Sequence, residues 1–447
     1  MIALSDNKPK VSLCTLGCKV NQYESQAIAE DFERLGFSLS SFDEKCDVYV
    51  INTCTVTGES DKKSRQMIRR ARKNGGEDAL VIAIGCFTQA QKDDIAKITE
   101  LDAAFGNSDK SQVAQFACDI LKDRDKTKFC NKICDISKFS EYDRMSITHS
   151  ERTRAFVKIV DGCENKCTYC IIPSVRGKIR SRDLDDIIKE LSVLADAGYK
   201  EVVLTGIETA AYGKDLCGCN LAQLLKEADK VKGIERIRLG SLEPTVIKDE
   251  LVRTLASMKH AVPHFHLSLQ SGSDSVLRGM KRKYNTKQFF DAITKLKEHI
   301  PDVTFTTDII VGFPGESEEA FAETCDFVKK CGFLYVHIFP YSKRKGTPAA
   351  DFPDQLPESV KKERAAKLKE VMLETRNEVL KSFDGKETTV IFEEKNSDGF
   401  FTGHTPHYIE VFLPKESDRD LSSEMCRCKL HYQKDENGHG YMVCDII

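Results

Sequence analysis

The sequence predicts an α/β protein in three parts: an N-terminal parallel α/β domain, a central open barrel of six βα units, and a small C-terminal all-β module. Apolar runs alternate with helical stretches over residues 9–117, and six further apolar runs, the first five each followed by a helical stretch, occupy residues 152–356. Short alternating runs without helices follow residue 385. At 447 residues, the chain is long enough for about three domains.

The N-terminal domain is predicted from three apolar runs, VSLCTLG, DVYVINT and ALVIAIG, each followed by a turn and a helix. This order is typical of a parallel sheet with crossover helices. Residues 118–151 are polar and irregular, so we expect a linker there that could include an edge strand.

The central barrel is predicted from six strand-like runs, of which the first five are followed by helical stretches: AFVKIV, EVVLTGI, RIRLGSL, HFHLSLQ, VTFTTDIIVGF and YVHIFPY. Six units instead of eight predict an open, three-quarter barrel with right-handed crossovers. In such folds the chemistry lies at the C-terminal ends of the strands. The sequences there are DGCENKC, TGIE, SLEP, LQSGS, IIVGFPGE and FPYSKRKGT.

The C-terminal part begins with a long charged helix over residues 357–384. Residues 385–447 then give the short runs TTVIF, YIEVFL and CKLHY between polar turns. We expect a small open barrel of the OB-like kind.

Composition indicates a cytoplasmic protein. The net charge is −3 with 31% charged residues, and the sequence shows neither an apolar secretion signal nor a run long enough to span a membrane. The 18 cysteines are therefore expected as thiols or metal ligands, not as disulfides. The pairs without matching partners are interpreted as structural thiols: Cys130 and Cys134, Cys217 and Cys219, Cys426 and Cys428.

Three cysteines, Cys163, Cys167 and Cys170, follow the first barrel strand in the stretch DGCENKCTYC. A closed zinc site would need a fourth ligand, and none lies nearby in the sequence. A 4Fe-4S cluster usually takes four cysteines, so three ligands leave one iron open to a substrate or cofactor. Zinc or buried thiols remain the alternative.

This motif resembles that of the radical S-adenosylmethionine (SAM) enzymes, including the aromatic Tyr169 before the last cysteine. The resemblance implies a reduced cluster that binds and cleaves SAM. It also implies that SAM is lined by residues at the other strand ends, with the guanidinium of Arg282 on its carboxylate. Tight turns and a solvated arginine are the alternative for these residues: Gly206, Glu208, Gln270, Ser271, Arg282 and the segment from Val311 to Glu316.

A second set of three cysteines, Cys18, Cys54 and Cys86, lies in the N-terminal domain, each after a strand-like run. Because the ends of parallel strands meet at one sheet edge, we expect these thiols to converge. Helix N-termini beyond them would offer amide donors to a cluster. Three scattered buried cysteines are the alternative.

With this second set, the chain resembles the radical SAM methylthiotransferases along nearly its whole length. GCKVNQYES, HLSLQSGSDSVLRGMKRKYN and HIFPYSKRKGTPAA resemble the MtaB-like branch, which acts on N6-threonylcarbamoyladenosine at position 37 of tRNA. MiaB-like modification of N6-isopentenyladenosine, RimO-like modification of a ribosomal protein aspartate, and a non-catalytic iron-sulfur electron carrier are the alternatives.

The resemblance implies a division of labour between two 4Fe-4S clusters and two SAM molecules per turnover. One SAM methylates sulfur at the auxiliary cluster of Cys18, Cys54 and Cys86; the other yields the radical that removes hydrogen from carbon 2 of the adenine. The implied partners are tRNA and an electron donor such as a flavodoxin or ferredoxin, and we expect a monomer without a membrane.

The resemblance also implies that the C-terminal module, called TRAM, grips RNA, yet acids outnumber bases there. The acids include Glu393, Glu394, Asp418, Asp420, Asp435 and Glu436. A basic helix over residues 60–74 is a second candidate for phosphate contacts, with a solvated face as its alternative. The remaining candidates for RNA contact are His404, Tyr408, Lys429, Lys361, Lys362 and Arg364.

Overall fold

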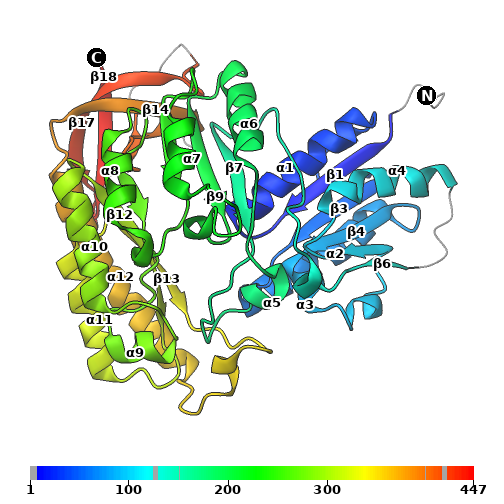
Figure 1. Ribbon diagram of the computed structural model, residues 1–447, viewed down its shortest axis with the longest axis horizontal. Coiled ribbons are helices and arrows are strands. Elements are labelled where there is room, and N and C mark those ends of the chain that lie inside the picture. The colour runs from blue at the N-terminus through cyan, green and yellow to red at the C-terminus, as the bar shows by residue number, and fades with distance from the viewer. Residues whose placement is uncertain (1–7, 124–128, 151, 398, 415–419) are drawn as a thin grey trace.

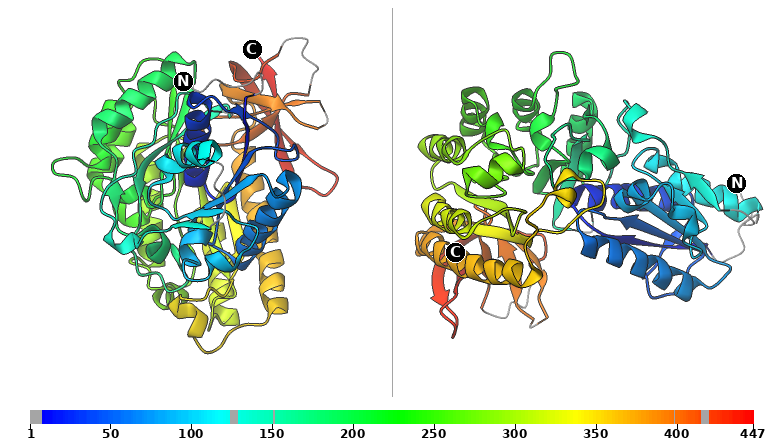
Figure 2. Two further views of the ribbon diagram at one scale, coloured as in Figure 1. Left: turned by 90° about the vertical axis from the view of Figure 1, so that its right-hand side faces the viewer. Right: turned by 90° about the horizontal axis from the view of Figure 1, so that it is seen from below.

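The computed structural model describes residues 8–123, 129–150, 152–397, 399–414 and 420–447. Figures 1 and 2 show the N-terminal domain beside the open side of a central barrel, and the C-terminal module against one end of that barrel. Among the described helices, none is both long and apolar enough to cross a membrane.

The N-terminal domain is a six-stranded parallel sheet in the order β2-β1-β3-β4-β5-β6. Its strands are β1 Lys10–Thr15, β2 Ser38–Leu39, β3 Val48–Thr53, β4 Leu80–Gly85, β5 Ala103–Phe105 and β6 Cys130–Lys132. Its helices are α1 Lys19–Arg34, α2 Gly58–Gly75, α3 Cys86–Ala90 and α4 Val113–Asp123. Strands β3 and β4 are buried throughout, as central strands of a parallel sheet require.

The expected linker differs from the structure at its start. Helix α4 continues past residue 117, because Ile120 and Leu121 extend its apolar face against the core. Strand β6 then pairs with β5 and becomes the edge strand of the N-terminal sheet. The N-terminal domain is therefore larger than residues 9–117.

The central barrel has six parallel strands, and in the described pairing no ladder returns from the last strand to the first. They are β7 Arg154–Asp161, β9 Glu201–Gly206, β10 Arg236–Leu239, β11 His264–His266, β12 Thr304–Val311 and β13 Tyr335–Pro340. Two isolated parallel bridges, Ile237 to Ala261 and Leu242 to Leu267, join β10 to β11. The short strand β8 Arg180–Ser181 pairs antiparallel with β7. This is the open six-unit barrel that the sequence predicts.

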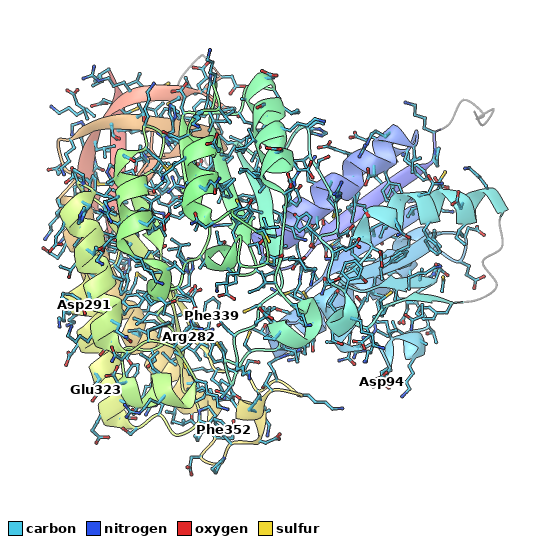
Figure 3. The ribbon with its side chains drawn as sticks, viewed as in Figure 1. Asp94, Arg282, Asp291, Glu323, Phe339 and Phe352 are labelled. Carbon is cyan, nitrogen blue, oxygen red and sulfur yellow. The ribbon has the colours of Figure 1, made fainter. Side chains whose placement is uncertain are left out.

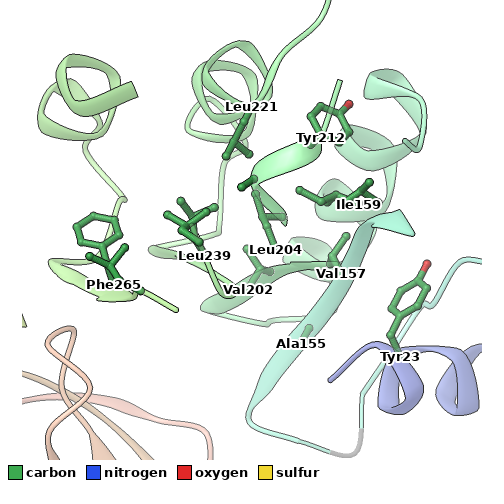
Figure 4. Close-up of a cluster of buried hydrophobic side chains, with 14 of the residues drawn as sticks. Tyr23, Ala155, Val157, Ile159, Val202, Leu204, Tyr212, Leu221, Leu239 and Phe265 are labelled. Carbon is green, nitrogen blue, oxygen red and sulfur yellow. The ribbon is translucent and has the colours of Figure 1, made fainter. Parts of the chain in front are cut away.

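Helices cover the outside of the barrel because strand residues alternate between its two faces. Val157, Leu204, Leu239 and Phe265 point to the helices and form one apolar core, which Figure 4 shows together with Tyr23 from α1. The opposite alternation places polar residues inside the barrel. The barrel's helices are α5 Ile172–Arg176, α6 Leu184–Asp196, α7 Leu221–Ala228, α8 Asp249–Ser257, α9 Asp274–Gly279, α10 Thr286–His299 and α11 Glu318–Cys331.

The C-terminal module follows helix α12 Glu358–Lys381, which packs on α11 and β13. It is a barrel in the order β14-β15-β16-β18-β17, and it is closed, not open as expected, because β16 pairs in parallel with β18. Its strands are β14 Glu387–Lys395, β15 Phe401–His404, β16 Glu410–Phe412, β17 Met425–Lys434 and β18 Gly440–Ile446.

This closed barrel covers the floor of the central barrel, where the strands begin. The hydroxyl of Thr304 donates to the carbonyl of His407 at 2.6 Å, and the guanidinium of Arg236 donates to the carbonyl of Thr389 at 2.8 Å. The ring of Tyr408 stacks on His264 with the ring centroids 4.7 Å apart. The cysteine loop lies at the other end of the strands, so the mouth of the barrel stays free of the C-terminal module.

Candidate active site at the barrel mouth and the domain junction

The loop between β7 and α5 carries Cys163, Cys167 and Cys170, all partly exposed and none in a disulfide. Gly162 begins the loop with a φ of +78°, and a Cβ there would lie 1.8 Å from the carbonyl oxygen of Lys178, so glycine is required. The amide of Cys163 donates to Gly177 at 3.0 Å. The loop is thus fixed on both sides of its three thiols.

Charged side chains from two other strand ends and from the turn between α9 and α10 surround these thiols. Arg282 donates to the sulfur of Cys167 at 3.0 Å and forms an ion pair with Glu243 at 2.7 Å. The thiol of Cys163 lies 3.1 Å from Oε2 of Glu208. Burial raises the pKa of Cys163, and the carboxylate of Glu208 raises it further.

The remaining predicted SAM residues take different positions. Gly206 packs so closely on β7 that a Cβ would lie 2.4 Å from Val160. Gln270 has a φ of +72° and joins β12 through its backbone. Ser271 is buried and its hydroxyl lies 3.3 Å from that of Thr324, so it faces α11. Val311 is buried in the core.

Tyr169 packs against a small apolar cluster that includes Phe313 and Tyr341. The structure thus gathers Glu208 and Arg282 at the thiols, while Val311 and Ser271 support the strand ends. Glu243 is a residue that the sequence reasoning did not single out, although it lies in SLEP at the end of the third barrel strand.

The second set of cysteines converges at the carboxyl edge of the N-terminal sheet. Cys18 is the N-cap of α1, Cys54 follows β3, and Cys86 begins α3. A Cβ on Gly17 would lie 2.9 Å from the sulfur of Cys54, which shows how closely the backbone before Cys18 approaches that thiol. Burial raises the pKa of both Cys18 and Cys54.

Arg176, from α5 of the barrel, connects the two sets of cysteines. Its guanidinium is fully buried and its Nε donates to the sulfur of Cys86 at 3.3 Å. The side-chain amide of Asn107 donates to the same sulfur at 3.5 Å. Helix α3, which begins with Cys86, packs on α5, which begins two residues after Cys170, so the two sites lie next to each other across the domain junction.

A buried ionic network holds Arg176 in place. Glu24 forms ion pairs with Arg176 at 2.7 Å and Lys158 at 2.8 Å, and it also pairs with Lys110. Asp161 pairs with Lys158 at 2.6 Å. Burial by itself would raise the pKa of Glu24, but these cations hold it well below its usual range. The cations of this network, Arg176, Lys158 and Lys110, outnumber its carboxylates, Glu24 and Asp161.

The donor chemistry of both sets fits iron-sulfur clusters. Among the described residues, the potential metal ligands whose atoms all lie within 4.8 Å of one another are His266, Asp308 and His337. The thiols of the two cysteine sets do not meet this distance, so neither set is compact enough to hold a single metal ion. A cluster with one iron for each cysteine holds its sulfurs farther apart. N–H donors on the sulfurs of Cys86 and Cys167 are the contacts that stabilise a cluster's negative charge.

Most residues expected to contact RNA have other partners. Lys361 and Arg364 are buried and pair with Glu358 and Glu316, and Tyr408 lies against the barrel floor. These three side chains are therefore unavailable to phosphates or bases, because burial, ion pairs and ring stacking within the protein already occupy them. His404 pairs with Glu393, Lys362 and Lys429 are exposed, and Asp418 lies outside the described residues.

The basic helix α2 is also largely neutralised. Arg69 pairs with Glu100, Arg70 with Asp43, and Arg72 with Asp102. Lys63, Arg65 and Lys73 are its cations without an ion pair in the described part of the chain, and the guanidinium of Arg65 lies over the ring of Phe87. The helix therefore presents less free positive charge than its sequence suggests.

Comparison with known proteins assigns a class to this fold and site. Residues 157–328 match the model of the Radical SAM superfamily, and residues 10–106 match Uncharacterized protein family UPF0004. The solved radical SAM methyltransferase TsrM from Kitasatospora setae has a TM-score of 0.57 at 15% identity, over 77% of each chain, which shows a shared fold. Fold and cysteine loop together define a radical SAM protein, a class that uses a 4Fe-4S cluster and SAM.

Closer relatives narrow this class. The chain is 42% identical to the threonylcarbamoyladenosine tRNA methylthiotransferase MtaB of Bacillus subtilis, over 94% of this chain and 93% of the relative. It is 41% identical to MtaB of Aquifex aeolicus over 87% and 93%. The tRNA-2-methylthio-N(6)-dimethylallyladenosine synthase of Acetivibrio thermocellus is 36% identical over 96% and 90%. The chain belongs to the radical SAM methylthiotransferase family that contains these enzymes.

Proposed function

We propose that this enzyme adds a methylthio group to carbon 2 of N6-threonylcarbamoyladenosine at position 37 of tRNA, in the cytoplasm. The observation that carries the proposal is the junction at Arg176, which places two sets of three cysteines next to each other in a chain with MtaB relatives over most of its length. Addition of a methylthio group needs both hydrogen removal and sulfur delivery at one carbon, so two adjacent sites suit it.

The barrel site would hold the first cluster on Cys163, Cys167 and Cys170. When bound, this cluster supplies the electron that starts homolytic cleavage of SAM. The chain's part is to orient SAM: Arg282 lies at Cys167, with a planar fork suited to a carboxylate, and Glu208 lies at Cys163. The ion pair with Glu243 holds the guanidinium of Arg282 in its position beside Cys167.

The N-terminal site would hold a second cluster on Cys18, Cys54 and Cys86. When bound, it supplies a place for the sulfur that is methylated and transferred. Arg176 and Asn107 direct N–H groups at Cys86 and so stabilise negative charge on sulfur. Two SAM molecules per turnover, a flavodoxin- or ferredoxin-like electron donor and a monomeric enzyme complete the proposal.

The N-terminal domain also closes the open side of the barrel, which keeps water from a reactive centre. On one side α1 packs against β7. On the other, Arg344, from the loop after β13, donates to Thr55 at 2.6 Å and pairs with Asp61 at 2.9 Å. Strand β7 and the loop after β13, on the two sides of the gap, thus both contact the domain that carries the second set of cysteines.

The test is anaerobic reconstitution with iron and sulfide, followed by SAM, a strong reductant and tRNA that carries either N6-threonylcarbamoyladenosine or N6-isopentenyladenosine. We expect nucleoside mass spectrometry to show a methylthio product from the threonylcarbamoyl substrate alone. A product from the isopentenyl substrate would support the other tRNA activity instead. If 5′-deoxyadenosine accumulates and neither RNA changes, the substrate assignment is wrong and a protein acceptor is next.

The two-site scheme has its own test in the triple variant Cys18→Ala, Cys54→Ala, Cys86→Ala. We expect this variant to lose methylthio transfer because the sulfur site is gone. The scheme is wrong if the variant modifies tRNA as well as the parent enzyme does.

A further inference from the structure

The inner face of strand β13 presents aromatic side chains to solvent. Tyr335 and Phe339 are 41% and 44% exposed, and His337 between them is exposed too, whereas Val336 on the other face is buried in the core. Strand alternation places these three rings on one side of β13. Figure 3 labels Phe339 close to Arg282 in its view. We call Tyr335, His337 and Phe339 the aromatic strip.

Polar groups adjoin the aromatic strip on the neighbouring strands. Asp308 on β12 is the register partner of His337, and its carboxylate lies 3.1 Å from Nε2 of His266 on β11. The ligand atoms of His266, Asp308 and His337 all lie within 4.8 Å of one another. An exposed aromatic ring therefore stands beside a compact set of hydrogen-bonding groups.

Lys19 reaches the same interior from the N-terminal domain, at the first turn of α1. It interacts electrostatically with Asp308 as well as with Arg238 and Arg154. Those two arginines have carboxylate partners, Glu201 and Glu393. Lys19 is partly buried and, among the described residues, no hydrogen bond or ion pair holds its ammonium group, although the carboxylates of Asp308 and Glu201 act on it electrostatically.

We propose that the aromatic strip and Lys19 form the pocket for the substrate base, an inference that rests on the proposed function. Phe339 stacks on the purine, since base–aromatic stacking needs only a π-face. Asp308 and the two histidines hydrogen-bond the polar substituent on N6, and Lys19 pairs with its carboxylate. An isopentenyl substituent has neither a carboxylate nor a hydroxyl, so the same residues would select against it.

The first experiment measures the affinity of the reconstituted enzyme for anticodon stem-loop RNAs by fluorescence anisotropy. One RNA carries N6-threonylcarbamoyladenosine and another carries its methyl ester, which removes only the negative charge. We expect the wild type to bind the acid about tenfold more tightly than the ester, Lys19→Gln to bind both equally, and Lys19→Arg to restore the preference.

The matched control is Lys345→Gln, at an exposed lysine outside the barrel interior. It should keep the preference for the acid. Equal weakening of acid and ester by Lys19→Gln would assign Lys19 to an RNA phosphate and overturn the proposal. The proposed function itself would fail separately, through a wild-type enzyme that does not modify the threonylcarbamoyl substrate. Iron content must match across variants, because Lys19 follows Cys18.

The second experiment tests stacking with Phe339→Leu. We expect affinity for both the acid and the ester RNA to fall about fivefold or more, while Phe400→Leu, at a 41% exposed ring on the C-terminal barrel, changes neither. Equal affinities of Phe339→Leu and wild type would contradict the assignment of the strip. The assignment would also be contradicted if the wild type bound stoichiometric zinc or manganese and His337→Gln did not. His266, Asp308 and His337 would then be metal ligands.

Discussion

At the scale of single residues, Arg176 links the chemistry of the two sites. It is fully buried, and its guanidinium meets Glu24, Asp161, Asn21 and the sulfur of Cys86. A buried ionic network contributes little net stability, but loss of one member leaves its partners uncompensated. Nothing in the sequence IIPSVRGK distinguishes this arginine from a surface one, because its partners come from residues far away in the chain.

We expect Arg176→Met to lower the free energy of unfolding by about 3–5 kcal/mol, since Glu24 loses a cation that faces it. Urea denaturation of the anaerobic protein measures this. Arg427→Met is the control, because Arg427 pairs with Glu387 at the surface and such pairs contribute almost nothing. Similar destabilisation by the two variants would show that the buried network is not the cause.

At the scale of elements, the turn from β4 into α3 positions Cys86. Gly85 has a φ of +104°, and a Cβ there would lie 2.8 Å from both Oδ1 of Asn52 and the carbonyl oxygen of Thr53. Only glycine allows the chain to turn this tightly into a helix that begins with Cys86.

Gly85→Ala should therefore displace Cys86, and under the proposed two-cluster scheme the reconstituted protein should fall from about eight irons per chain to about four. Gly76→Ala is the matched control, because Gly76 also has a positive φ of +72° but has open space around its Cβ position. It should keep its iron. Full iron content in Gly85→Ala would show that this turn does not position the ligand.

Elements with strong periodicity could be predicted from the sequence, and those decided by pairing could not. The six barrel strands follow from apolar runs between helices. The closure of the C-terminal barrel depends on the parallel pairing of Val411 with Met442, which no local pattern encodes. Likewise, β6 joins the N-terminal sheet only because the edge of β5 is free to pair with it.

The cysteine sets show the same division. Convergence of Cys18, Cys54 and Cys86 could be expected from parallel strand ends, whereas burial of Lys361 and Arg364 could not, because charge composition does not show which side of a helix packs. The sequence pattern locates candidate ligands along the chain, and tertiary packing decides which charged side chains remain without a partner.

At the scale of the whole molecule, the C-terminal barrel is joined to the floor of the central barrel by the loop of residues 404–408. His407 lies in this loop, and burial lowers its pKa to about 4, aided by Lys386, Arg238 and Arg236 and opposed by Asp302. The folded protein thus keeps this imidazole neutral, although the unfolded chain takes up a proton near pH 6.5.

Stability should therefore fall as the pH drops from about 6.5 towards 4, by as much as about 3 kcal/mol from this one group. His407→Gln cannot take up the proton, so its free energy of unfolding should depend less on pH over this window. Urea denaturation at pH 7 and 4.5 gives the comparison, with His439→Gln at an exposed histidine as the control. Equal pH dependence of wild type and His407→Gln would refute the assignment.

The direct contact between Arg176 and Cys86 has a consequence for how such proteins can be recombined. Asn21 and Glu24 lie in the N-terminal domain, and both accept hydrogen bonds from Arg176, which lies in the barrel. A chimera that exchanges residues 8–123 between relatives would keep both sites only where these three side chains are inherited together. The two domains have separate folds, but they have to be inherited or exchanged as one unit because this contact joins them.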